Sequence, residues 1–166
     1  SNNLQRHMET VLIPGVELTH IPPKIIEDLA SKARKLGAAL IVVHGETVVE
    51  PVIPGTNRMA MNCSNVDILA HPGLIGEAEA ELARENGIYL ELSSRVGHCL
   101  TNGHVAKIAS KVKAKLLVNT DLHEPKDFLS QEAAFRVAMG SGLTEVDAVK
   151  AVRDNPLEVL RRSISK

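Results

Sequence analysis

The sequence predicts an α/β fold in which strands and helices alternate within one domain. Short apolar runs rich in Leu, Ile and Val alternate with longer segments of helical periodicity, and the connections between them are short. This alternation is typical of a parallel sheet, either open or closed into a barrel. A chain of 166 residues can build one substantial core, so we expect a single domain over residues 1–166.

Five apolar runs are predicted to be the strands of this sheet. They span residues 11–18, 38–46, 65–73, 88–94 and 116–125. The last run, LLVNTDLHEP, opens with three apolar residues, as expected of a strand buried on both faces. Asp121 and His123 lie two positions apart near its end, so on a strand their side chains would share one face.

The segments between the runs carry helical patterns. In residues 21–37 the prolines stand at the front, apolar residues recur at helical spacing, and Gly37 supplies a C-terminal stop. Further helices are predicted at residues 57–63, 77–87 and 104–114, and near 131–139, 144–153 and 156–163.

The composition argues against nucleic acid as a partner. The chain has 19 Lys and Arg against 20 Asp and Glu, a formal net charge of −1, so no strongly basic surface is expected. Aromatic residues make up 2% of the chain, so stacking platforms for bases are scarce. A phosphorylated small molecule remains compatible with this charge balance.

The cysteine content and the hydropathy predict a cytoplasmic protein. The two cysteines, Cys63 and Cys99, form no CxxC motif, so reduced thiols are expected rather than a disulfide framework. No apolar run approaches the length of a membrane span, and no signal-peptide pattern opens the chain. We therefore expect no association with membranes.

Polar residues gather at the ends of the five predicted strands. These residues are Glu17, His44, Glu46, His71, Glu91, Arg95, Asp121 and His123. In parallel α/β folds the functional groups lie at the carboxyl ends of the strands. Several carboxylates brought together repel one another unless cations compensate, and mixed His and carboxylate ligands suit Zn, Mn or Fe. The sequence therefore predicts a metal site that holds more than one ion.

Four motifs at these strand ends resemble the polymerase-and-histidinol-phosphatase (PHP) family of metal-dependent phosphoesterases. They are PGVE at 14–17, VVHGE at 42–46, DILAHPG at 67–73 and NTDLH at 119–123. The stretch ELSSRVGHCLTNGH at 91–104 is similar to the corresponding segment of histidinol-phosphatase-like members. The resemblance implies a distorted barrel of seven βα units with two or three divalent metal ions at its C-terminal face.

The resemblance also implies roles for individual residues. The implied metal ligands are Glu17, His44, His71, Asp121 and His123. Arg95 is the candidate for binding substrate phosphate, because a guanidinium can bind two oxygens at once. His98 is the candidate for assisting Arg95 or for donating a proton.

The chain departs from the family pattern at two motifs. It contains neither a His-x-His motif nor a Thr-Asp-His strand end, and it has about five strands where the family has seven. Three explanations are open: a fragment of a longer protein, a second chain or another copy of this chain that supplies strands, or a degenerate homologue. The incomplete barrel would expose a sheet edge, which proteins usually cover or pair.

The implied function is hydrolysis of a phosphate ester by a metal-activated water. If the missing strands supply indispensable ligands, the chain alone would be inactive. Two alternatives stay open. One is a metal-dependent amidohydrolase on a similar barrel, and the other is a non-catalytic PHP-like scaffold that binds protein or RNA.

Overall fold

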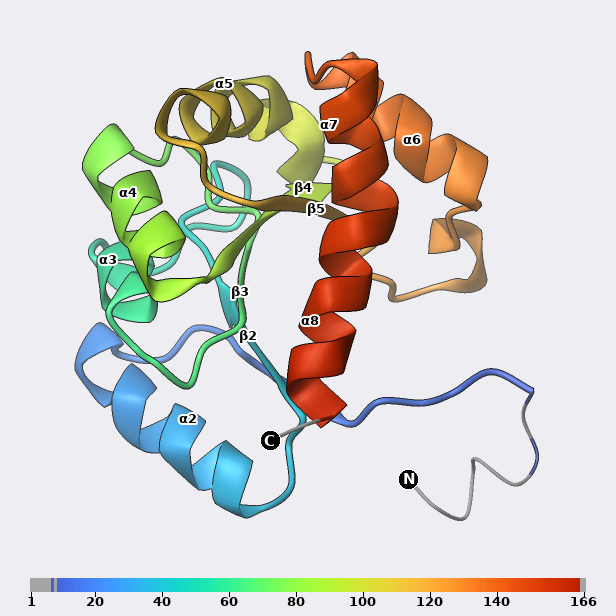
Figure 1. Ribbon diagram of the computed structural model, residues 1–166. Helices are drawn as coiled ribbons and strands as arrows, with labels where there is room; N and C mark the ends of the chain where they lie inside the picture. Colours follow the sequence, from blue (N-terminus) through green and yellow to red (C-terminus); the bar gives the residue numbers. More distant parts are fainter. Residues whose placement is uncertain (1–6, 8, 165–166) are drawn as a thin grey trace.

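A single parallel sheet organises the computed structural model, which describes residue 7 and residues 9–164 (Figure 1). Its five strands lie in sequence order, and every neighbouring pair is parallel. They are β1 (Gly15–Leu18), β2 (Leu40–His44), β3 (Ile68–Ala70), β4 (Tyr89–Ser93) and β5 (Leu116–Asn119). The predicted α/β fold with about five parallel strands is therefore confirmed, while the strands are shorter than the apolar runs that predicted them.

Helices connect and cover the strands. They are α2 (Ile26–Lys35), α3 (Thr56–Met61), α4 (Glu77–Asn86), α5 (Asn102–Val112), α6 (Gln131–Gly140), α7 (Glu145–Val149) and α8 (Asn155–Ile164), and one π-helical turn (Lys150–Asp154) joins α7 to α8. Short 3-10 helices occur at Pro23–Ile25, His98–Thr101 and Pro125–Asp127. No helix in the described part of the chain is long and apolar enough to cross a membrane.

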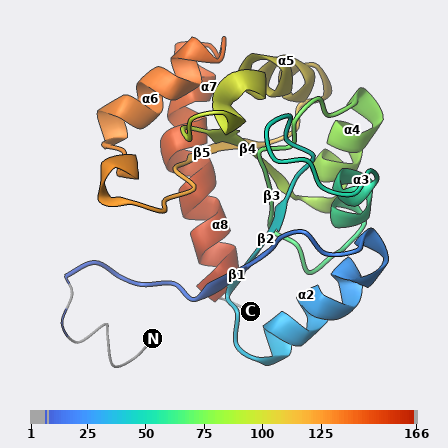
Figure 2. The ribbon, with the colours of Figure 1, turned by 180° about the vertical axis from the view of Figure 1, so that it is seen from behind.

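The larger core lies between the sheet and the helices α2 to α7. Strand side chains alternate between faces, and Ile41, Val43, Leu69 and Leu90 are fully buried among Ala and Ile side chains of the helices. The two opposite views show α2, α3, α4 and α5 arranged around this side of the sheet (Figures 1 and 2). This aliphatic core fixes the strands whose ends carry the polar residues.

The other face of the sheet is covered by α8. Val159 of this helix packs against Ile68, Tyr89 and Leu117 in a second, smaller apolar cluster. Within the described residues β1 pairs with β2 alone and β5 with β4 alone, so the sheet is open at both edges. Closure into a barrel is not seen.

The fifth strand ends earlier than its sequence pattern predicts. β5 stops at Asn119, and Asp121 has a φ of 47°. Asp tolerates this left-handed conformation better than most residues because its short side chain can hydrogen-bond locally. The prediction that Asp121 and His123 occupy one face of a strand is therefore wrong, because the chain has already turned before it reaches them.

A buried ion pair joins α2 to the beginning of the sheet. Arg34 pairs with Asp67, and its guanidinium also donates to the carbonyl oxygens of Ala39 at 2.7 Å and Asn65 at 2.8 Å. Asp67 is 2% exposed and accepts a 2.8 Å hydrogen bond from the amide of Ile41. This network fixes the amino-terminal ends of β2 and β3 at the end of the sheet opposite to the polar residues.

Removal of Arg34 should destabilise the fold strongly. We expect Arg34→Ala to lower the free energy of unfolding by about 3–5 kcal/mol, because it removes the positive charge that compensates the buried Asp67 carboxylate. Chemical denaturation followed by circular dichroism measures this loss. The matched control is Arg153→Ala, which breaks the exposed pair with Asp154 and should leave stability close to that of the wild type. Similar losses for the two variants would contradict the structural role given to Arg34.

Candidate metal centre

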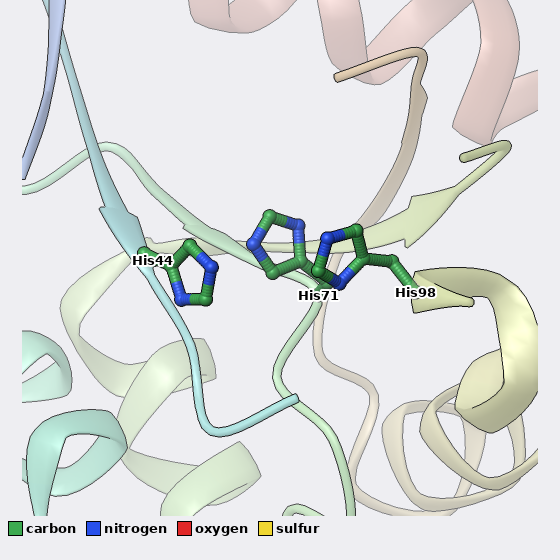
Figure 3. A group of neighbouring side chains, drawn as sticks. All are labelled: His44, His71 and His98. Carbon is green, nitrogen blue, oxygen red and sulfur yellow. The ribbon is translucent and has the colours of Figure 1, made fainter. Parts of the chain in front are cut away.

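Three histidines meet at the carboxyl ends of the strands. His44 is the last residue of β2, His71 follows β3, and His98 begins the 3-10 helix after β4 (Figure 3). One ring nitrogen of each lies within 4.8 Å of one ring nitrogen of the other two, and all three side chains are buried. The rings of His71 and His98 stack with centroids 4.1 Å apart. The parallel sheet thus brings together three histidines, each 27 positions after the one before it in the sequence.

The ring nitrogens of this group are oriented for ligation. His44 Nδ1 donates to the carbonyl oxygen of Gly45 at 2.9 Å, so Nε2 carries the lone pair, and this buried atom has no hydrogen-bond partner. His98 Nδ1 is bonded to the hydroxyl of Thr47 at 2.9 Å, which leaves its Nε2 facing the group. Neither ring nitrogen of His71 has a hydrogen-bond partner. His44 and His98 thus show the arrangement typical of metal-binding histidines, in which one ring nitrogen is held by a hydrogen bond and the other is available to a metal.

Carboxylates surround the three imidazoles. Glu50 Oε2 lies 3.7 Å from both His44 Nε2 and His98 Nε2. Asp121 Oδ2 lies 3.7 Å from His98 Nε2, and Glu91 Oε1 lies 3.7 Å from His71 Nδ1. These separations exceed hydrogen-bond length. They are near the ~3.4 Å between neighbouring ligands of a tetrahedral ion with bonds of about 2.0–2.1 Å, so the side chains fit a Zn-like ion.

Burial and charge act in different directions on the histidines. Burial, reinforced by the neighbouring His71, lowers the pKa of His44 and of His98 and favours their neutral, ligating form. Burial also acts to lower the pKa of His71, but the carboxylates of Glu91, Glu17 and Asp121 outweigh it, and the net shift is upward. The group therefore combines two neutral imidazoles with one that is surrounded by negative charge.

Glu17 reaches this end of the sheet from the edge strand β1. Glu17 is an exposed residue, but burial of its carboxyl group among protein atoms raises its pKa. The charge of His71 opposes this shift, and those of Asp121 and Glu91 add to it. Mutual repulsion among such carboxylates is the condition that a bound cation relieves.

The other predicted site residues form an adjoining group. Arg95 Nε lies 3.5 Å from Asp121 Oδ2, and its Nη1 donates to the Asp121 carbonyl oxygen at 3.0 Å. His123 Nδ1 lies 2.8 Å from the same carbonyl oxygen and also contacts Arg95. His123 is exposed and lies outside the three-histidine group, whereas Asp121 lies between this group and Arg95.

Three residues near this group were not among the implied ligands. His98, expected to assist Arg95 or to donate a proton, lies with His44 and His71 in the histidine group. Glu91 stood out at a strand end but was not among the implied ligands. It pairs with Leu117 of β5, and its Oε1 lies 3.7 Å from His71 Nδ1. Glu50 was missed because it lies in an irregular loop, where no periodicity marks the direction of a side chain.

Backbone strain concentrates at this end of the molecule. His20, His71 and Asp121 have φ values of 53°, 31° and 47°, and they account for three of the four non-glycine residues with positive φ in the described chain. The fourth, Lys113, ends α5. Strained residues persist where the surrounding structure fixes them, which is common at ligand sites.

Solved structures of similar fold include chains with different functions. A chain of an archaeal ribonuclease P with mature tRNA superposes with a TM-score of 0.78 at 18% identity, covering 98% of this chain and 73% of that chain. An amidohydrolase gives a TM-score of 0.66 at 17% identity, covering 89% of this chain and 42% of its own. An uncharacterized protein gives 0.64 at 14% identity, covering 89% and 44%. At these identities the likeness concerns the fold alone.

The sequence comparison is more specific. No known family model matches the chain. The uncharacterized protein MJ1295 of Methanocaldococcus jannaschii is 50% identical over 154 residues, which cover 93% of this chain and 71% of that protein. The protein therefore belongs to the same family as MJ1295 of Methanocaldococcus jannaschii.

Proposed function

We propose that the protein is a metal-dependent hydrolase of the PHP type that cleaves phosphate esters of small molecules. The observation that carries this proposal is the three-histidine group, in which His44 Nε2 and both ring nitrogens of His71 are buried without a hydrogen-bond partner and carboxylates lie nearby. A bound divalent ion, Zn, Mn or Fe, would supply a hydroxide at neutral pH and polarise the phosphoryl oxygens. No nucleophilic side chain is needed for such a reaction.

The chain's own residues have distinct tasks in this proposal. His44, His71 and His98 would hold the ion through ring nitrogens, and Asp121, whose Oδ2 lies 3.7 Å from His98 Nε2, would add a carboxylate ligand. Glu91 lies against His71 Nδ1 and restricts the orientation of that ring. Glu17 adds a carboxylate from the edge strand, where a second ion would offset the charges of Asp121 and Glu91.

Arg95 favours an anionic substrate over an amide. Its guanidinium brings a permanent positive charge beside Asp121 at a site otherwise rich in carboxylates, and part of its side chain is exposed. From this position it can bind two phosphoryl oxygens and orient the ester bond toward the histidine group. His98 lies 3.7 Å from the same Asp121 carboxylate, so the phosphate-binding and metal-binding residues share one neighbour.

Two other functions have a specific observation in their favour. The fold likeness to a ribonuclease P chain covers nearly the whole protein, which favours a non-catalytic scaffold within an RNA–protein assembly. The amidohydrolase neighbour favours hydrolysis of an amide by the same metal group. The buried, unpartnered histidine nitrogens favour both enzymes over the scaffold, and Arg95 favours the phosphoesterase. The exposed edge of β1 leaves room for a second copy or another chain to add strands.

Metal retention tests the central element of the proposal. We expect the protein, purified without chelator, to hold Zn, Mn or Fe, and His71→Ala to lose most of it, because His71 lies at the centre of the group. Elemental analysis by mass spectrometry measures the ratio of metal to chain. His7→Ala, at an exposed position, is the control and should retain the wild-type ratio. A folded wild-type protein with no metal would refute the metal-dependent mechanism.

Hydrolysis assays test the substrate class. We expect the metal-loaded protein to cleave phosphate monoesters in preference to an amide panel, and Arg95→Met to raise KM about 10–100-fold, since a hydrogen bond to a charged group contributes about 1.5–3 kcal/mol. Arg58→Met, in an exposed position on α3, is the control for loss of a positive charge.

The outcomes separate the alternatives. Cleavage of amides without phosphate esters would support the amidohydrolase. A folded, metal-loaded protein with neither activity would support the scaffold.

A further inference from the structure

Glu50 occupies a loop that is fixed at its base. The loop joins β2 to α3, and Glu46 Oε1 accepts hydrogen bonds from the amides of Gly55 and Asn57, both at 2.9 Å. The two ends of the loop are thus tied together by a single side chain. The intervening residues therefore project over the histidine group from a fixed base.

The tip of the same loop packs against the segment that carries His98. Gly97 has a φ of 90°, and a Cβ atom placed on it would lie 3.1 Å from a methyl group of Val49. This contact packs the loop against the start of the 3-10 helix that begins at His98. Glu50, the next residue after Val49, is thereby held beside the imidazoles.

The two carboxylate oxygens of Glu50 face different histidines. Oε2 lies 3.7 Å from His44 Nε2 and from His98 Nε2, whereas Oε1 lies 3.8 Å from His20 Nε2. His20 follows β1, and its ring centroid is 5.4 Å from that of His44. His20 Nδ1 is bonded to the hydroxyl of Thr19 at 2.9 Å, so its Nε2 faces the carboxylate. Glu50 thus lies between an inner group of buried histidines and one outer histidine.

We propose that Glu50 bridges two divalent cation sites, an inner site shared with His44 and His98 and an outer site shared with His20. The proposal rests on the inner metal site of the proposed function and adds an outer site with its own ligands. Separations of 3.7–3.8 Å are too long for hydrogen bonds. They resemble the ~3.4 Å between two ligands of one tetrahedral ion. His44 Nε2, buried and without a hydrogen-bond partner, marks the inner end of the bridge.

The two sites differ in exposure and therefore in the tightness with which they hold an ion. The inner histidines are buried, whereas the side chains of His20 and Glu50 are each 50% exposed. With two protein ligands from the described chain, the outer ion keeps positions open for water and for a phosphoryl oxygen. Paired ions about 3.5–4 Å apart can clamp both the attacking and the leaving oxygen of a phosphoryl group. The outer ion is thus the exchangeable, substrate-facing one.

Manganese titration of the metal-free full chain tests the bridge. Free Mn²⁺ is measured by electron paramagnetic resonance, which also detects spin coupling between two bridged ions. We expect two sites in the wild type, a tight one and a weaker one, with a coupled signal at full loading. His20→Ala should keep the tight site and lose the weaker site and the coupling. Glu50→Gln should lose the outer site and weaken the inner one about 10-fold or more, as changes around metal ligands commonly do.

Matched variants and folding measurements make the outcomes decisive. His7→Ala and Glu145→Gln are the controls for His20→Ala and Glu50→Gln, because they remove an imidazole and a carboxylate at other exposed positions. Both controls should bind Mn²⁺ like the wild type. Circular dichroism confirms that each variant is folded. A single site in the wild type, or two unchanged sites in His20→Ala, would overturn the outer site while leaving the proposed metal-dependent function intact. A folded wild-type protein that binds no Mn²⁺ and no Zn²⁺ would overturn both.

Discussion

Parallel pairing of five strands in sequence order is the constraint on which the site depends. Every strand runs in the same direction, so every segment that leaves a strand starts at the same edge of the sheet. His44, His71 and His98 are far apart in the chain, yet each lies at or just beyond the end of a strand. The aliphatic core between the sheet and its helices stabilises this register, and the ion pair of Arg34 with Asp67 secures the opposite end. The site is thus positioned by packing that contains none of its own residues.

The same convergence has an electrostatic cost. Burial raises the pKa of Glu17, and the charges of Asp121 and Glu91 add to this shift. The carboxylates of Glu91, Glu17 and Asp121 raise the pKa of His71 against the effect of its burial. In a fold without ions, this end of the sheet would hold negative charges that repel one another at reduced solvation. Arg95 offsets part of this charge through Asp121. In the described part of the chain no arginine forms a comparably close ion pair with Glu91 or Glu17. The arrangement is therefore best stabilised by cations that approach from the open end of the sheet.

The parts of the structure that could be predicted from sequence are those governed by periodicity. The apolar runs predicted five strands in a parallel sheet, and the strand-end rule placed His44 and His71 at one edge. The failures occur where the chain leaves regular structure. Asp121 adopts a left-handed conformation beyond β5, so the two-residue spacing to His123 no longer predicts a shared face. The position of Glu50 depends on how Glu46 ties the loop and on how Val49 meets Gly97, which are contacts between distant segments.

The fold alone does not decide between an enzyme and a scaffold, because the same architecture occurs in a ribonuclease P chain and in an amidohydrolase. The decision rests on energetics at the site. Leaving a buried polar group without a partner costs about 1–3 kcal/mol, and His44 Nε2 and both ring nitrogens of His71 are in that condition. Together, the costs of these three nitrogens are a large fraction of the roughly 5–15 kcal/mol by which the folded state of a domain is typically favoured. A scaffold would gain nothing from this cost, whereas metal ligation converts the same unpartnered nitrogens into a source of stability. The binding of an ion would therefore contribute to the folding of this edge as well as to chemistry, which favours a protein whose native state contains metal.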